Sequence, residues 1–458
     1  MRPFEILTLI LVSGSMVALL THKKKKVFLY LLFSSIIFTL LQHFIEGGRW
    51  QLTLLIYLLP AMYIIYRYEN IRALNIAAKI VLPVWLLLAI LLPWVIPIFT
   101  LPYPGGNYNI GTETFHWVDS LRPELFTPEN NSDVREIMVQ AWYPAEVPDS
   151  INPETYLDHI DYRAATIAAA GKIPSFFPQH LEYITTNSHK NVPFISNDSL
   201  APILIFSHGI TGSRHLHQAM FEYLASRGFI VFAPDHSFDA NLTIFPDGHI
   251  ANYRSDITGH PDSINIRKMQ IKTRSTDISF IIDQLESIQS GDLKSTLTGN
   301  IDLNTIAVGG HSYGGATATV ASHNDPRIKA CVVLDSWFSP VPDKTIESGI
   351  QVPFLFMGRP TWEESDYPDN YLKLDRLLAN SPNPKYRLII KKTQHLDYTD
   401  APLFSPIISY VLEIGPIPAS TSIPLMNQLT YGFLRKHLGP NNGKQFDSLL
   451  QHNPFIQY

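Results

Sequence analysis

A serine flanked by glycines is the first feature of this sequence that could do chemistry. It stands in Gly310-His311-Ser312-Tyr313-Gly314, with Gly315 directly behind it. An apolar run at 305–308 precedes these residues, and a small-residue segment compatible with a helix follows at 316–321. This order predicts a strand, a sharp turn and a helix, with Ser312 at the apex of the turn. Glycines suit this turn because the apex residue adopts a strained backbone conformation and a neighbouring side chain would collide with it.

The strand, turn and helix are typical of the nucleophile elbow of α/β-hydrolases, so Ser312 is the predicted nucleophile. A serine hydroxyl is a poor nucleophile at its own pKa, so a base must take its proton and a third group must orient that base. In this fold the chain order is serine, acid, histidine. We predict His395 as the base because it alone lies in the loop directly after the final predicted strand, where the loop can carry it back over the serine. The other histidines after Ser312 lie in or near predicted helices or in the tail: His323, His437 and His452.

Spacing alone leaves the acid open. Asp335 ends the strand predicted at 330–334, and the carboxyl end of a parallel strand is where such sheets place their sites. Glu363, Glu364 and Asp366 follow the next predicted strand, which is a common alternative location. The spacing favours Asp335 over these three by a small margin.

An ester-cleaving serine also needs two backbone N–H groups to bind the oxyanion. One comes from the residue after the nucleophile, which is Tyr313, and the other from the loop at 207–212 after an earlier strand. We predict Ile210 as the second donor, because Gly209 lets the backbone turn inward. His208 and His311 are interpreted as structural hydrogen-bonding residues beside the site.

A further polar cluster could in principle bind a metal ion, since carboxylates and imidazoles lie close together in the sequence. Its spacing matches no known ligand signature, and polar loops at the end of a sheet are common. We therefore predict no metal and no other cofactor. The cluster consists of Asp235, His236, Asp239, Asp247 and His249.

Alternating apolar runs and helical patterns surround these residues. The pattern predicts an α/β-hydrolase fold, with a mostly parallel central sheet covered by helices on both faces. Strands are predicted at 111–118, 134–143, 203–206, 229–233, 305–308, 330–334, 353–357 and, last, 386–390. Helices are predicted at 162–170, 216–227, from about 263 to 288, at 316–321 and, last, 425–438.

The first hundred residues have a different composition. A helix needs ~20 apolar residues to cross the hydrocarbon core of a membrane. Four apolar stretches have that length or nearly so: about 4–20, 27–45, 52–66 and 76–99. The third is the shortest and contains Pro60, so three spans remain an alternative to four. No small-residue cleavage site follows the first stretch, which favours a retained helix over a signal peptide. We predict a membrane region at 1–102 with about four transmembrane helices and a catalytic domain at 103–458.

Charge sets the expected topology and partners. Residues 1–102 hold 9 Lys/Arg and 3 Asp/Glu, and the rest of the chain holds 26 and 37. The lysine run at 23–26 and the basic loop at 67–79 are predicted to be cytoplasmic, which places the catalytic domain of this integral membrane protein outside the cytoplasm. An acidic main domain argues against nucleic acid as a partner. The bilayer is the expected partner of the first helices, and no pattern indicates an oligomeric state.

Together, four segments of the sequence resemble the plasma-type platelet-activating factor acetylhydrolases and the bacterial esterases grouped with them. These segments are 206–210, 310–317, 334–337 and 394–395. The resemblance spans about residues 105–438 and implies Ser312 as nucleophile, Asp335 as acid and His395 as base. It also implies oxyanion donors at Ile210 and Tyr313. Members of this family are calcium-independent esterases that cleave short or oxidised acyl chains at the sn-2 position of phospholipids.

The sequence thus predicts a membrane-anchored serine esterase acting on a small-molecule or lipid ester, with short or truncated phospholipid acyl groups as the leading candidates. The apolar helices depart from the plasma enzyme and leave the natural substrate open. Two alternatives remain. One is a serine peptidase of the prolyl-oligopeptidase type, although no repeated propeller blades are present. The other is a membrane receptor or scaffold that kept the fold without the chemistry.

Overall fold

The computed structural model describes residues 1–21, 25–195, 199–257, 260–363, 365, 367–439 and 443–458. Within this part of the chain, two compact units form. The helical unit comprises Met1–Thr100, Leu157–Ile184 and Phe404–Ile407, and the hydrolase unit comprises Leu101–Tyr156, Thr185–Leu403 and Ile408–Tyr458.

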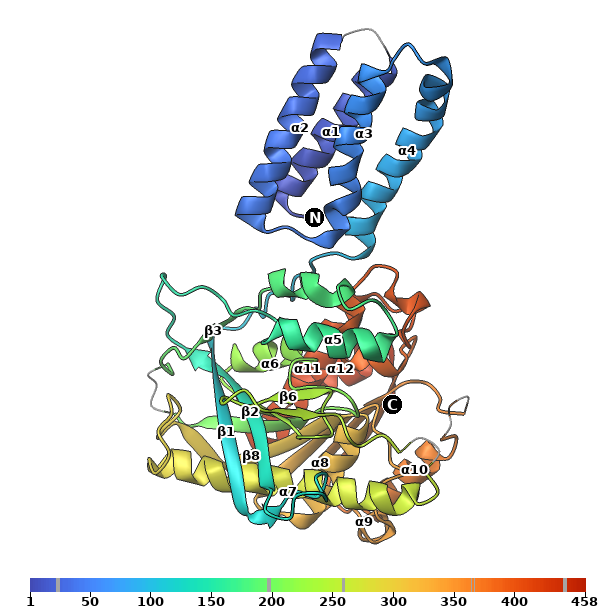
Figure 1. Ribbon diagram of the computed structural model, residues 1–458. Helices are drawn as coiled ribbons and strands as arrows, with labels where there is room; N and C mark the ends of the chain where they lie inside the picture. Colours follow the sequence, from blue (N-terminus) through green and yellow to red (C-terminus); the bar gives the residue numbers. More distant parts are fainter. Residues whose placement is uncertain (22–24, 196–198, 258–259, 364, 366, 440–442) are drawn as a thin grey trace. The chain divides into compact units, whose positions relative to one another are not determined.

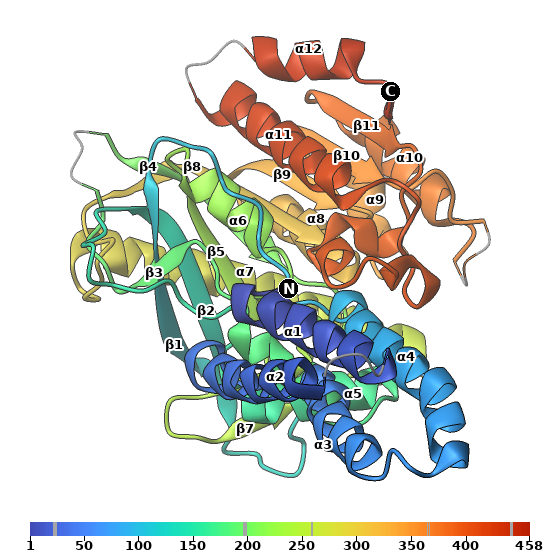
Figure 2. The same cartoon turned by 90° about the horizontal axis from the view of Figure 1, so that it is seen from above.

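Helices account for most of the helical unit, and α1 packs beside α2 and α3 beside α4 (Figures 1 and 2). Each of the four apolar stretches forms a helix. By length and composition, three of the described helices could cross a membrane: α1, α2 and α4. The third stretch gives the 15-residue α3, which is shorter than the ~20 residues that a span requires. The elements are α1 (Pro3–Leu20), α2 (Lys25–Glu46), η1 (Trp50–Leu52), α3 (Thr53–Arg67), α4 (Arg72–Val95), α5 (Ile160–Gly171) and η2 (Phe177–Tyr183).

Two segments from later in the chain belong to this same unit. The Trp50 indole donates from Nε1 to the carbonyl of Phe177 at 3.1 Å and packs against the rings of Phe176 and Phe177. The hydroxyl of Ser405 donates to the carbonyl of Val95 at 2.6 Å. Local contacts therefore tie 157–184 and 404–407 to the first hundred residues. Of the predicted cytoplasmic lysine run, Lys23 and Lys24 lie outside the described residues.

A ten-stranded sheet forms the centre of the hydrolase unit, in the order β12-β11-β10-β9-β8-β4-β5-β2-β1-β3. Strands β11 to β5 in this order pair in parallel, whereas β2 pairs antiparallel with β5 and with β1. This architecture confirms the predicted fold class. The strands are β1 (Asn109–Pro123), β2 (Val134–Ala145), β3 (Ser188–Lys190), β4 (Ala201–Ser207), β5 (Ile230–Asp235), β8 (Ile301–His311), β9 (Ile328–Leu334), β10 (Phe354–Gly358), β11 (Lys385–Ile390) and β12 (Ile456–Gln457).

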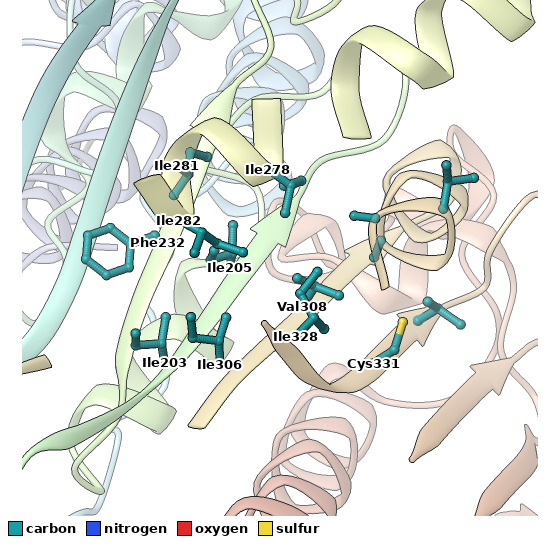
Figure 3. Close-up of a cluster of buried hydrophobic side chains, with 14 of the residues drawn as sticks. Ile203, Ile205, Phe232, Ile278, Ile281, Ile282, Ile306, Val308, Ile328 and Cys331 are labelled. Atoms are coloured by element: carbon teal, nitrogen blue, oxygen red, sulfur yellow. The ribbon is translucent and has the colours of Figure 1, made fainter. Parts of the chain in front are cut away.

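Helices cover both faces of this sheet because successive strand residues point to opposite faces. In β4, Ile203 and Ile205 enter a buried cluster with Ile278 of α7, as Figure 3 shows. The intervening Leu204 belongs to a second cluster on the other face, with Leu429 of α11. The helices are α6 (Gln218–Ala225), α7 (Ser263–Ser290), α8 (Tyr313–Asn324), α9 (Asp343–Ser348), α10 (Asn370–Asn380), α11 (Ala419–Leu438) and α12 (Lys444–His452).

The structure adds elements that the sequence pattern did not predict. The loop expected after β5 contains the small antiparallel hairpin of β6 (Leu242–Ile244) and β7 (Ile250–Asn252). The predictions that 386–390 is the last strand and 425–438 the last helix are wrong, because α12 and β12 follow. β12 has only two residues and pairs antiparallel with β11, so it owes its strand conformation to that pairing. The short helical turns after β11 are η3 (His395–Tyr398), η4 (Ala401–Leu403) and η5 (Ile408–Tyr410).

Candidate active site

The turn between β8 and α8 holds Ser312 in a strained conformation, with φ 56° and ψ −120°. A Cβ atom on Gly310 would lie 2.2 Å from the backbone of Gly314, and one on Gly314 would lie 2.0 Å from the carbonyl oxygen of Ser207. Neither position can carry a side chain without moving the backbone. The backbone N–H of Ser312 donates to the carbonyl of Leu334 at 2.9 Å, which ties the turn to β9.

Three side chains predicted to act together meet beside this turn. The Nε2 atom of His395 lies 2.9 Å from Oγ of Ser312, and its Nδ1 atom lies 2.6 Å from Oδ2 of Asp335. A carboxylate only accepts hydrogen bonds, so Nδ1 carries the ring proton and Nε2 is free to accept the proton of the serine hydroxyl. The arrangement can therefore transfer a proton from serine to imidazole while a buried carboxylate holds the ring.

Two residues that the sequence analysis did not identify hold the Asp335 carboxylate. Its Oδ1 atom accepts the backbone N–H of Arg359 at 3.0 Å and the indole N–H of Trp362 at 3.2 Å. The guanidinium of Arg359 lies 3.3 Å from Oδ2. Trp362 also packs edge-on against the ring of His395, with ring centroids 5.5 Å apart. The carboxylate is thus fully buried and accepts three hydrogen bonds, which keep its orientation toward His395.

A capping arrangement positions the loop that carries His395. The Asp397 carboxylate accepts the backbone N–H groups of Gln394 at 2.7 Å and Gly415 at 2.6 Å. Burial raises the pKa of Asp397 to about 6, against the lowering effect of these two donors. From the other side, Nε2 of His311 donates to the carbonyl of His395 at 2.9 Å. Burial and the neighbouring His395 lower the pKa of His311 well below its ordinary value, so His311 is a neutral hydrogen-bond donor.

The loop that contains Ile210 packs directly on the elbow. A Cβ atom on Gly209 would lie 3.3 Å from Cβ of Ser312, so the loop and the turn are in close contact. The ring of His208 donates from Nδ1 to the Gly209 carbonyl at 2.6 Å, and its Nε2 accepts the backbone N–H of His236 at 3.1 Å. Burial lowers the pKa of His208 well below its ordinary value. Both flanking histidines, His208 and His311, are neutral members of the hydrogen-bond framework.

Tyr313 is the first residue of α8, and a helix leaves its first N–H groups without partners inside the helix. The positive end of the helix therefore lies beside the Ser312 hydroxyl, where negative charge would develop during ester cleavage. Ile210 and Ser312 line the same cavity. Both backbone groups predicted as oxyanion donors thus belong to segments that border the nucleophile.

The competing acids and histidines that the structure describes lie away from Ser312 Oγ. Glu363 has an exposed side chain, whereas Glu364 and Asp366 lie outside the described residues. His323 and His452 lie near the ends of α8 and α12. The imidazole of His437 contacts the hydroxyl of Tyr386 at 3.3 Å. The described histidines other than His395 make no hydrogen bond to Ser312 Oγ.

The cluster considered for a metal ion is divided among separate partners. Asp235 pairs with Arg214 and Asp239 pairs with Arg274, while His249 contacts Asp247 and Glu136. His236 bridges the Ser207 hydroxyl and the Asp277 carboxylate, at 2.9 and 2.8 Å. Among the described residues, no group of three or more His, Cys, Asp or Glu side chains is placed to hold a metal ion.

A cavity of ≈400 Å³ opens beside Ser312 and His395. Aromatic side chains line much of it: Trp337, Trp362 and Tyr367. Two guanidinium groups, of Arg267 and Arg359, and the carboxylate of Glu413 contribute the charges. The cavity is therefore amphipathic and large enough to hold a small ester next to the serine.

With this geometry in hand, comparison with known proteins places the chain in a family. Residues 102–454 match the family described as platelet-activating factor acetylhydrolase, isoform II. The chain belongs to this family. The match begins where the four apolar stretches end, so the family resemblance lies in the α/β part of the chain. Its relatives are described as platelet-activating factor acetylhydrolases, a putative phospholipase A2 and a probable 1-alkyl-2-acetylglycerophosphocholine esterase.

Individual relatives are distant. A platelet-activating factor acetylhydrolase from Canis lupus familiaris is 29% identical over 379 residues, which covers 77% of this chain and 80% of the relative. A probable 1-alkyl-2-acetylglycerophosphocholine esterase from Arthroderma benhamiae is 23% identical over 367 residues, covering 74% and 88%. A solved structure of a ferulic acid esterase from Streptomyces cinnamoneus aligns with a TM-score of 0.64 at 23% identity, covering 79% of this chain and 99% of that chain. This last likeness supports the shared fold.

Proposed function

We propose that the protein is a serine esterase that hydrolyses carboxylic esters through Ser312, His395 and Asp335. One observation carries the proposal: a continuous hydrogen-bond chain from the buried carboxylate through the imidazole to the serine hydroxyl, at 2.6 and 2.9 Å. Family membership supports the same conclusion, because the relatives are described as platelet-activating factor acetylhydrolases, a probable esterase and a putative phospholipase A2.

The reaction follows from the roles of these groups. Oγ of Ser312 attacks the ester carbonyl as Nε2 of His395 takes the hydroxyl proton. The backbone N–H groups of Ile210 and Tyr313 stabilise the oxyanion, and the imidazolium then protonates the departing alkoxide. Water activated by His395 cleaves the acyl-enzyme and releases the acid. Asp335 stays ionised throughout and stabilises the imidazolium.

Short or truncated sn-2 acyl groups of phospholipids are the proposed substrates. The support is the family and the small volume of the cavity, ≈400 Å³, which suits a short acyl group better than a full-length chain. Purified full-length protein assayed on phospholipids that differ only in sn-2 acyl length should show turnover that falls as the chain lengthens. Constant turnover from acetyl to palmitoyl would contradict the proposal.

The direct test of the mechanism is covalent labelling by a fluorophosphonate, which reacts with activated serines. The wild-type chain should be labelled and Ser312→Ala should not, whereas Ser290→Ala, on the exposed end of α7, provides the matched control. Labelling that persists in Ser312→Ala would end the assignment. Turnover of p-nitrophenyl acetate but not of a proline anilide would separate esterase from peptidase, and failure of every ester would favour a non-catalytic protein.

We also propose that residues 1–102 anchor the protein in a membrane and that residues 103–458 act outside the cytoplasm. This orientation requires the 15-residue α3 to cross the membrane together with α1, α2 and α4, which have the length and composition of spans. The positions of the basic loops support it. Reporters fused after Lys26 and after Gly106 should fall on opposite sides of the membrane. Reporters found on the same side would contradict the orientation.

A further inference from the structure

The charges that line the cavity beside Ser312 differ in how well they are neutralised. Arg359 is balanced: its Nη1 lies 3.2 Å from Oε2 of Glu413, and its Nε lies 3.3 Å from Oδ2 of Asp335. These two carboxylates account for its positive charge. Arg359 therefore serves to hold Asp335 and offers little attraction to a substrate.

Arg267 lines the same cavity and is not balanced in this way. Its Nη1 donates to the neutral amide oxygen of Gln270 at 2.7 Å. Its Nε is buried and has no hydrogen-bond partner within the described residues. In that part of the chain, no carboxylate forms an ion pair with Arg267. A guanidinium has five N–H donors, so this residue retains donors and a full charge for a ligand.

The aromatic lining of the cavity also bears on whether the cavity would attract a cationic or an anionic ligand. Aromatic faces can bind a quaternary ammonium group, but here the protein's own guanidinium groups already lie over two of the lining rings, Trp337 and Trp362. The guanidinium of Arg267 lies 5.5 Å from the ring centroids of both Trp337 and Tyr313, and that of Arg359 lies 4.1 Å from the centroid of Trp362. A second cation in the cavity would be repelled by these charges, whereas an anion would be attracted.

We infer that Arg267 binds an oxyanion of the ester substrate, a phosphate or a carboxylate, and so determines specificity for anionic esters. The inference rests on the proposed function of Ser312. Planar, bidentate recognition of phosphate and carboxylate is the interaction to which a guanidinium is best suited. Arg267 lies in the N-terminal third of α7, next to Lys268, so its position is held by a long helix packed on the sheet. A zwitterionic lipid would then be recognised by its phosphate and not by its ammonium group.

Two series of esters test this inference and distinguish the sources of the oxyanion. In the first, 1-butyl-2-acetylglycerol carries a free hydroxyl, a phosphate or a phosphocholine group, so that only the alcohol side changes. In the second, 4-nitrophenyl valerate is compared with the mono-4-nitrophenyl ester of glutaric acid, so that only the acyl side gains a carboxylate. The quantity measured is the ratio of kcat/KM for the anionic ester to that for the neutral ester, in the full-length protein.

In at least one series, Arg267→Gln should lower this ratio by about tenfold, the effect of losing one hydrogen bond between charged groups. Arg267→Lys keeps the charge and should retain most of the ratio. Lys268→Gln removes a neighbouring charge that does not line this cavity, and it should leave the ratio unchanged. The series that responds identifies phosphate or carboxylate as the recognised group.

An unchanged ratio for Arg267→Gln in both series would overturn the inference. Should that variant fail to fold, the wild-type protein provides a second measurement: butyl phosphate or butyrate should inhibit hydrolysis of the neutral ester more strongly than butyltrimethylammonium. Equal inhibition by the anions and the cation would also overturn it. Failure of the wild type to hydrolyse even the neutral esters would instead refute the proposed function, so the two failures are distinct.

Discussion

The clearest quantitative prediction concerns Asp335→Asn. The carboxylate accepts hydrogen bonds from Nδ1 of His395 at 2.6 Å, the backbone of Arg359 at 3.0 Å and the indole of Trp362 at 3.2 Å. Asparagine has the same shape but only one acceptor oxygen. Because the two donors at Oδ1 would keep that oxygen, the amide NH₂ would face His395. An NH₂ group can pair with Nδ1 only when Nδ1 lacks a proton.

The expected consequence is the wrong histidine tautomer. With its proton on Nε2, the imidazole of His395 donates to Ser312 and can no longer accept the serine proton. The substitution also removes the charge that stabilises the imidazolium. In the well-studied serine protease triad the same change lowers kcat by about 10⁴-fold, and we expect a loss of about 10³-fold or more here. That loss corresponds to about 4 kcal/mol of activation free energy.

The assay is hydrolysis of p-nitrophenyl acetate by the full-length protein, with kcat and KM determined separately. KM should change little, because Asp335 does not line the cavity beside Ser312. Asp343→Asn, on the exposed first turn of α9, is the matched control and should behave as the wild type. A folded Asp335→Asn protein that keeps kcat within tenfold of the wild type would refute the reasoning.

Three further predictions concern the elbow, a buried carboxyl and the single cysteine. Gly310→Ala should abolish fluorophosphonate labelling and destabilise the fold by about 1–3 kcal/mol, because its Cβ would lie 2.2 Å from the backbone of Gly314. Gly171→Ala is the control, because its Cβ would lie 3.6 Å from the nearest atom. Equal effects of the two substitutions would refute the predicted clash at Gly310. Burial raises the pKa of Asp397 from 3.8 to about 6, so the proton stabilises the fold below pH 3.8 and this stabilisation is lost as the pH rises through 6. The unfolding free energy of Asp397→Asn minus that of the wild type should therefore rise by up to about 3 kcal/mol over this window, and a flat difference would contradict the raised pKa. Burial also raises the pKa of the Cys331 thiol to about 12, so a disulfide reagent should label the thiol only after denaturation; prompt labelling of the native protein would show that the strand β9 is open.

Local patterns in the sequence were sufficient for the main elements. Parallel strands that are buried on both faces appear as continuous apolar runs, which is why β4, β5, β8, β9, β10 and β11 were all predicted. Short or context-dependent elements were missed. The hairpin β6–β7 and the two-residue β12 have little periodicity and depend on pairing with neighbouring strands. The helix α10 was also not predicted, although its sequence carries a helical pattern: Leu374, Leu377 and Leu378 recur at helical spacing and are buried.

The residues of the candidate site also divide into those that local patterns predicted and those that they left open. The elbow motif and the chain order selected Ser312 and His395, because a strand, a glycine turn and a helix are local features with a known chemical purpose. The choice among acids required more than spacing. In the structure, Asp335 lies against His395, whereas Glu363 is exposed; this relation joins residues 60 positions apart.

Local patterns therefore predicted the fold class, the apolar character of the first hundred residues, and the nucleophile and base. The folded chain was needed to show which groups surround them: the donors on Asp335, the two carboxylates that pair with Arg359 and, among the described residues, the lack of an ion pair at Arg267. The difference lies in the separation along the chain of the residues that interact. Secondary structure and turns follow from neighbours along the chain, whereas the charge and hydrogen-bond state of a buried group depends on residues that the folded sheet brings beside it.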